Sequence, residues 1–212
     1  MEYMPGELSD GTTPYSAFKE NEGKVVTIKG AIHNIRDMSD FAFIILRTAR
    51  ELIQCVYSPE FSDYRLKENV VEQASAKITG KVVKSQTRDG SERFEIQIHD
   101  IEILSVPAAI APVVINKKQV NCDLNIDLDF RPVTLRNPKE RAVFKIQEGI
   151  QRGFREHLSN CGFTEIHTPK INFAGAEGGT NVFKLDYFGK TVFLAQSPQL
   201  YKQALVPVYE RV

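Results

Sequence analysis

AKITGKVV at residues 76–83, followed by RFEIQI at residues 93–98, alternates polar and apolar side chains. Alternation with a period of two is typical of a β-strand that buries one face. The segment Arg88-Asp89-Gly90-Ser91 between the two runs is composed of residues that favour turns. We therefore expect the two runs to pair as an antiparallel hairpin around that segment.

Three more strands are predicted upstream of this hairpin. They span residues 24–30, 41–47 and 52–57, and Ala49-Arg50-Glu51 forms a tight connection between the second and the third. A short helix is predicted at residues 64–73. Three strands, a helix and two strands match the element order of a five-stranded OB-fold barrel.

The composition then changes to a linker. Residues 107–112 are small, apolar and bounded by proline, and residues 116–127 are polar. The predicted division is an OB-fold domain at 1–110, a linker at 111–127 and a second domain at 128–212.

A long amphipathic helix opens the second domain. Asn137 is a good N-cap, Pro138 suits the first helical position, and Glu140 completes a pattern like a capping box. Gly162 ends the helix, and a short strand is expected at residues 164–167. Apolar residues recur at spacings of three and four, as they do on a core helix: Val143, Ile146, Ile150, Phe154 and Leu158.

QSPQLYKQ at residues 196–203 predicts the start of another helix. Ser197 can cap its N-terminus, and Gln199 and Lys202 share one helical face with Gln203. This face offers one cation and two amides, which suit a small anion. The acid Glu177 lies upstream in a loop of small residues, so the two segments together could bind both ends of an amino acid. Each segment alone is better explained by a solvated helix face or an ordinary turn.

Composition narrows the class of protein without selecting a function. The 212 residues carry 27 basic and 27 acidic side chains, which balance, and a neutral chain can still bind nucleic acid through a local basic patch. The three widely spaced cysteines form no disulfide or zinc pattern, which favours reduced, mostly buried thiols in a cytoplasmic protein. No apolar run reaches membrane-spanning length, and no signal pattern is present.

Five segments in order resemble aspartyl-tRNA synthetases of the archaeal and eukaryotic-cytosolic kind, which are class II enzymes. The resemblance covers roughly residues 20–212. The segments are LDFR at 128–131, AVFKIQ at 142–147, GFTEIHTPKI at 162–171, EGGTNVF at 177–183 and FLAQSPQLYKQ at 193–203.

This resemblance implies a mixed β and α+β fold. The five-stranded OB barrel would be followed by the first part of the antiparallel-sheet catalytic domain of a class II synthetase. The helix at residues 138–161 would be motif 1 and would form much of a homodimer interface. The implied activity is aspartate–tRNA ligation, in which ATP activates L-aspartate and the adenylate then esterifies tRNA(Asp). Whether tRNA(Asn) is also a substrate is left open.

The resemblance assigns four residues to aspartate. Lys202 would pair with the β-carboxylate, because a buried lysine left unpaired by asparagine is costly. Gln199 would lie beside the ammonium group, with a smaller part for Ser197. Glu177 would pair with the ammonium group from a closing loop. Related enzymes usually have serine before this glutamate, where this chain has Ala176.

The resemblance also assigns an anticodon site to the barrel. An aromatic and a glutamine eleven residues apart contact the anticodon in the resembling enzymes, and Phe43 and Gln54 have this spacing. Phe43 would stack on a base, Gln54 would read the central base, and Arg36 and Arg47 would meet phosphate or base. Without the resemblance, Phe43 is better explained as a core residue that shares a face with Phe41.

The ATP-binding arginines of class II motifs 2 and 3 are absent from the sequence, and motif 2 is expected just after Val212. We therefore expect an N-terminal portion of a longer enzyme, inactive alone, with no catalytic residues and with the ligands of ATP and Mg²⁺ beyond residue 212. Three alternatives stay open: a non-catalytic tRNA-binding or regulatory protein, an asparaginyl-tRNA synthetase, and a synthetase-like asparagine synthetase. Lys202 argues against the second, and an OB barrel against the third.

Overall fold

The structure is a computed structural model that describes residues 11–38, 40–60, 69–86, 90–173 and 182–212. It divides into two compact units, Met1–Arg141 and Ala142–Val212. The predicted domain limits at residues 110 and 127 stay a prediction.

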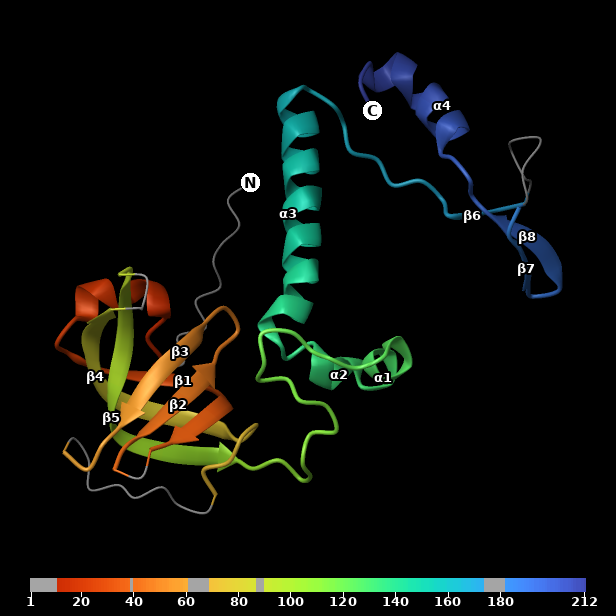
Figure 1. Cartoon of the computed structure of the whole chain (residues 1–212). Coiled ribbons are helices and arrows are strands. Elements are labelled where there is room, and N and C mark those ends of the chain that lie inside the picture. Colours follow the sequence, from red (N-terminus) through yellow and green to blue (C-terminus); the bar gives the residue numbers. More distant parts are fainter. Residues whose placement is uncertain (1–10, 39, 61–68, 87–89, 174–181) are drawn as a thin grey trace. The chain divides into compact units, whose positions relative to one another are not determined.

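Five strands of the first unit close into a barrel in the order β1-β2-β3-β5-β4 (Figure 1). Their bounds are β1, Val25–Asp37; β2, Ala42–Arg47; β3, Leu52–Tyr57; β4, Ser75–Gln86; and β5, Glu92–Ser105. Neighbouring strands are antiparallel except β3 and β5, which are parallel over Cys55↔Ile96 and Val56↔Gln97. The predicted five-stranded barrel is confirmed.

The barrel interior is filled by alternate residues of every strand. Phe18, which lies between the short 3₁₀ turns Tyr15–Ala17 and Lys19–Asn21, is fully buried and belongs to the same core. The strands contribute mainly branched aliphatic side chains, which pack densely in a small barrel. Those less than 2% exposed include Ile28, Ile32, Ile44, Leu46, Ile53, Ile78, Ile96 and Ile98.

The predicted helix at residues 64–73 is not supported. Residues 61–68 lie outside the described residues, and residues 69–73 form turns rather than a helix. Gln73 has a left-handed backbone with φ of 71°. Its N–H donates to the carbonyl of Ile32 at 2.7 Å, so this turn is fastened directly to β1.

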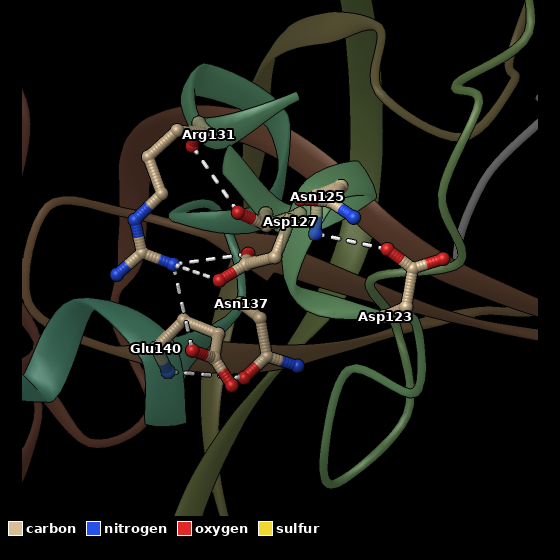
Figure 2. Close-up of polar contacts among 7 residues, drawn as sticks. Asp123, Asn125, Asp127, Arg131, Asn137 and Glu140 are labelled. Carbon is tan, nitrogen blue, oxygen red and sulfur yellow. Dashed lines mark hydrogen bonds and ion pairs between the residues drawn. The ribbon is translucent and has the colours of Figure 1, made fainter. Parts of the chain in front are cut away.

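Two short helices, α1 (Leu124–Asp129) and α2 (Arg131–Thr134), lead into the long helix α3 (Pro138–Asn160). Figure 2 shows the guanidinium group of Arg131 between Asp127, at 2.9 Å, and Glu140, at 3.7 Å. A hydrogen bond from Thr134 and then the bond from Arg131 hold the pKa of the Asp127 carboxyl below its usual range. The Glu140 side chain thus pairs with Arg131, whereas the backbone N–H of Asn137, its expected partner in a capping box, donates to the carbonyl of Thr134 at 2.9 Å.

Asn137 is the predicted N-cap of α3. Its Oδ1 accepts from the N–H groups of Lys139 at 2.9 Å and Glu140 at 3.4 Å. Its Nδ2 donates to the carbonyls of Ile115 at 2.9 Å and Lys117 at 2.8 Å, and the side chain is fully buried. One residue therefore caps the helix and fixes the segment before it to the helix start.

The second unit contains the rest of α3, a small sheet and a last helix. The sheet has the order β6-β8-β7 and is antiparallel, with β6 at Ile171–Asn172, β7 at Lys184–Tyr187 and β8 at Lys190–Leu194. Helix α4 follows at Gln199–Tyr209. Gly162, with φ of 80°, ends α3 as predicted, but residues 164–167 form no strand.

Few side chains of the second unit are covered. Among its described residues only Val192 is buried, and no residue of α3 is. The helix prediction for the apolar stripe is confirmed, but its placement in a core is wrong for this chain, because Ile146, Ile150 and Phe154 are 61–68% exposed.

Three further features concern the described part of the chain. All three cysteines are free, but only Cys55 is buried, whereas Cys122 and Cys161 are partly exposed. None of the helices in the described ranges is long and apolar enough to cross a membrane. Among the residues that the structure describes, no three His, Cys, Asp or Glu side chains gather where they could hold a metal ion.

Candidate nucleic-acid interface and amino-acid site

The outer face of β1, β2 and β3 carries three of the four predicted anticodon residues close together. Because Ala42, Ile44 and Leu46 fill the barrel, Phe43 on the same strand points outward and is half-buried, so the core alternative for it is wrong. Phe43 packs edge to face against Phe41, with ring centroids 5.3 Å apart.

Strand register places Arg36 and Gln54 around this aromatic pair. Arg36 of β1 is exposed and lies directly across from Phe43, which in turn faces Val56 of β3. Gln54 lies across from Ile45, two residues along, so it is a diagonal neighbour of Phe43 at about 7–8 Å between Cα atoms. The face therefore presents an aromatic ring, an amide and a cation, which suit stacking, base reading and phosphate contact.

Gln54 has a partner that sequence reasoning missed. Its Nε2 donates to Oε2 of Glu95 on β5 at 2.8 Å. This bond leaves the Oε1 of Gln54 directed away from Glu95 and fixes the orientation of the amide. The sequence separates the two residues by 41 positions, and only the parallel pairing of β3 with β5 brings them together.

Arg47 is held by a different set of residues. Its guanidinium donates to Nδ1 of His33 at 3.0 Å and to Oε1 of Gln73 at 3.1 Å. Since arginine can only donate, Nδ1 of His33 is the acceptor and the imidazole is neutral. Burial, then Arg47 and Arg141, lower the pKa of His33 to about 4. Neither His33 nor Gln73 was singled out from the sequence.

Three of the four residues predicted to bind aspartate, Ser197, Gln199 and Lys202, lie at the start of α4. The helix begins at Gln199, and the Ser197 hydroxyl accepts from the Gln199 N–H at 3.1 Å. Ser197 therefore stands one residue before the N-cap position, which Pro198 occupies. Gln199 and Lys202 are both exposed. Glu177 lies outside the described residues.

Lys202 lines a pocket of about 470 Å³ in the second unit. Lys170 and Thr168 line it too, and Lys170 Nζ lies 3.4 Å from the Thr168 hydroxyl. The acid of this pocket, Glu165, is bound by Arg155 through two hydrogen bonds of 2.9 and 3.0 Å, and this bonding lowers the pKa of the Glu165 carboxyl. The remaining lysines make the pocket suited to a carboxylate, whereas Ser197 and Gln199 are not among its lining residues.

Two family models match the chain, one for each part. Residues 26–104 match the OB-fold nucleic acid binding domain, and residues 123–212 match the class II tRNA synthetases (D, K and N). Over residues 123–212 the chain is similar to the class II tRNA synthetases of this D, K and N group.

Its curated relatives narrow the resemblance further. An Aspartate--tRNA(Asp/Asn) ligase of Deinococcus radiodurans is 42% identical over 91% of this chain and 42% of its own length. Ligases of the same name from Thermus thermophilus and Archaeoglobus fulgidus are 40% and 36% identical over 92% and 91% of this chain. They are covered over 44% and 45% of their lengths, so the chain spans less than half of these relatives. The resemblance to aspartyl-tRNA synthetases is confirmed.

Solved structures share the fold. An asparaginyl-tRNA synthetase of Pyrococcus horikoshii, complexed with asparaginyl-adenylate, has a TM-score of 0.73 at 25% identity over 90% of this chain and 43% of that one. A putative aspartyl-tRNA synthetase of Leishmania major has a TM-score of 0.71 at 24% identity over 97% and 43%.

Proposed function

We propose that this chain is the anticodon-binding domain and the aspartate-facing part of an aspartate–tRNA ligase. The observation that carries the proposal is the outward placement of Phe43 beside Gln54 on β2 and β3. Phe43 stacks on one anticodon base, Gln54 hydrogen-bonds the central base, and Arg36 meets the backbone. Arg47, bonded to His33 and Gln73, contributes charge to the same surface.

The amino-acid part of the proposal rests on Lys202 and its pocket. In the complete enzyme Lys202 pairs with the β-carboxylate of L-aspartate, Gln199 lies near the ammonium group with Ser197 beside it, and Glu177 closes over that group. Discrimination against asparagine needs a desolvated lysine. Lys202 is exposed in this chain. Its burial is therefore supplied by the part of the catalytic domain that the relatives have in addition.

The reaction joins aspartate to ATP with release of pyrophosphate and then transfers the aspartyl group to the 3′ end of tRNA. ATP supplies the activation, and Mg²⁺ balances the phosphate charge. The described residues do not fit a Mg²⁺ site, because no cluster of acidic or other ligating side chains forms among them. The proposed contribution of this chain to the reaction is binding and orientation. The proposed compartment of the reaction is the cytoplasm.

Two further partners are proposed. The names refer to tRNA(Asp/Asn), so tRNA(Asn) is proposed as a second substrate beside tRNA(Asp). A second copy of the chain is proposed to cover the exposed apolar stripe of α3, giving a homodimer. Sedimentation of the complete enzyme should then give twice the mass of one chain, and a monomeric mass would contradict the dimer.

The experiment that tests the function is an anisotropy titration of this chain with an anticodon stem-loop that carries GUC. A loop with the central base changed is the control, and a loop with GUU tests the proposed reading of tRNA(Asn). Tighter binding to GUC than to the changed loop is expected. Equal binding to both by a folded chain would refute anticodon reading by the barrel, and rejection of GUU would restrict the chain to tRNA(Asp).

A further inference from the structure

Three arginines of the first unit lie near one another at the C-terminal end of β2. Arg47 donates to Gln73 Oε1 at 3.1 Å, and Arg136, which follows α2, donates to the same oxygen at 3.4 Å. Arg141, in the first turn of α3, donates to the carbonyl of Thr48 at 3.0 Å. Arg47, Arg136 and Arg141 are called the arginine cluster below.

The arginine cluster is held together by neutral acceptors. These are the His33 imidazole, the Gln73 amide and the Thr48 carbonyl. Among the described residues none of the three arginines forms an ion pair with a carboxylate. Glu72, next to Gln73 in sequence, contacts Asn116, and Glu140, next to Arg141, contacts Arg131.

The other two guanidinium groups add to the effect of burial on Arg47. Burial, followed by the charges of Arg136 and Arg141, lowers the pKa of Arg47 to about 10. The N-terminal end of α3, where Arg141 lies, adds further positive potential through the helix dipole. Three unpaired cations at one place are unfavourable unless an anion joins them.

The acceptor at the centre of the cluster is also held in an uncommon conformation. Gln73 is not glycine, yet its backbone has φ of 71°. A left-handed residue of this kind persists only where its surroundings fix it, and such residues gather at functional sites. Gln73 is fixed by its bond to Ile32, so the barrel wall positions the amide that gathers two arginines.

We propose that the arginine cluster binds a phosphate of the RNA backbone beyond Phe43 and Gln54 along the same surface, an inference that rests on the proposed function. Arg47 lies on the same outer side of β2 as Phe43 but four residues along, or about 13 Å. An RNA strand that leaves the anticodon face along β2 reaches the cluster. Arg136 is exposed and supplies a planar donor pair that matches a phosphate, while Arg47 and Gln73 orient it.

The test compares salt dependence of RNA binding between variants of this chain. Arg136→Gln removes one charge from the cluster, and Lys81→Gln removes one from an exposed site on β4, across the barrel from β2 and β3. Binding of the GUC stem-loop is measured by anisotropy over a series of salt concentrations. The slope of log K against log salt should fall by about 0.7–0.9 in Arg136→Gln and stay unchanged in Lys81→Gln.

The result should not depend on the anticodon sequence, because a phosphate carries no base identity. Arg136→Gln should therefore weaken binding of GUC and changed loops by the same factor, and Arg136→Lys should restore most of the slope. Equal slopes in all variants would overturn the phosphate site even if GUC is still preferred. A slope difference without any preference for GUC would keep the phosphate site and refute the anticodon proposal.

Inorganic phosphate separates an RNA site from a general anion site. A ligand that binds only the folded state raises the melting temperature. The rise that phosphate causes in Arg136→Gln is subtracted from the rise in the unchanged chain, which removes the effect of phosphate on the rest of the surface. A phosphate-dependent rise lost in Arg136→Gln, together with the slope difference, supports the proposal. The same rise with equal RNA slopes would reassign the cluster to a free anion and overturn its role in RNA binding. If Arg136→Gln does not fold by circular dichroism, Arg141→Gln is measured in its place.

Discussion

The barrel and the residues after Arg141 differ in how far they bury their apolar side chains. The barrel encloses a continuous core with aliphatic side chains less than 2% exposed, whereas Val192 is the one buried residue described between 142 and 212. The two predicted sites therefore lie on scaffolds that differ in how much of their apolar surface is buried. The nucleic-acid face lies on a complete scaffold, and the amino-acid residues lie on one whose apolar surface is still open.

The largest effect expected from this comparison concerns stability. Ile98→Ala, in the barrel core, should lower the free energy of unfolding by about 2–5 kcal/mol, because it removes buried methylenes and leaves a cavity. Ile150→Ala on the exposed face of α3 should change it by no more than about 0.5 kcal/mol. Urea unfolding followed by circular dichroism measures both, and similar losses for the two variants would refute the contrast.

The second effect concerns Lys202 in the complete enzyme. Lys202→Ala should raise the KM for aspartate at least about thirtyfold and leave the KM for ATP nearly unchanged, because truncating one partner of a buried charge pair costs about 2–5 kcal/mol. Pyrophosphate exchange measures both constants, with Lys81→Ala in the barrel as the matched control. An unchanged KM for aspartate would remove Lys202 from the site.

The third effect concerns the barrel face. Gln54→Ala should reduce the preference for GUC over a changed central base by about tenfold, because a lost base contact costs about 1–3 kcal/mol. Gln86→Ala, an exposed glutamine on β4, is the control. Exchange of pyrophosphate by the complete enzyme should be nearly unaffected. A fall in exchange with the preference intact would show that the barrel was assigned wrongly.

The smallest effect is a pH dependence of the barrel. The pKa of His33 is about 4 in the fold, below its usual 6.5, so between these values the unfolded chain binds a proton that the folded chain does not. Stability should therefore fall as pH drops from 6.5 to 4, by at most about 1.4 kcal/mol per pH unit from this group. His33→Asn should remove that part of the slope in urea unfolding. A variant with the wild-type slope would contradict the assignment.

The strands could be predicted from sequence because alternation reports local geometry, and residues 52–57 were placed correctly at both ends. The run at 41–47 was harder. Its residues are apolar on both faces, so the sequence did not tell whether Phe43 or Ile44 fills the barrel. The answer depends on how the closed barrel packs, which is a property of all five strands together.

The proximity of the candidate site residues was predictable only where neighbouring strands are also neighbours in sequence. Phe43 and Gln54 lie on one hairpin, so their spacing indicated their proximity. Glu95 reaches Gln54 through the parallel pairing of β3 and β5, and Gln73 reaches Arg47 through a turn fastened to β1. Such contacts depend on tertiary closure and leave no local signal in the sequence. The exposure of α3 was missed for a related reason, because an apolar stripe does not say what covers it.

The parallel seam between β3 and β5 has a kinetic consequence. It joins only Cys55↔Ile96 and Val56↔Gln97, whereas the other strand pairs are longer and mostly formed between sequence neighbours. Because a long loop must close before strands distant in sequence can pair, we expect the hairpins to fold first and the pairing of β3 with β5 to form last. The same seam should open first in the folded protein, so its amides are expected to exchange hydrogen fastest among the core strands. The hydrogen bond between Gln54 and Glu95 crosses this seam. An RNA base that binds the Gln54 amide would therefore alter the rate at which the seam opens.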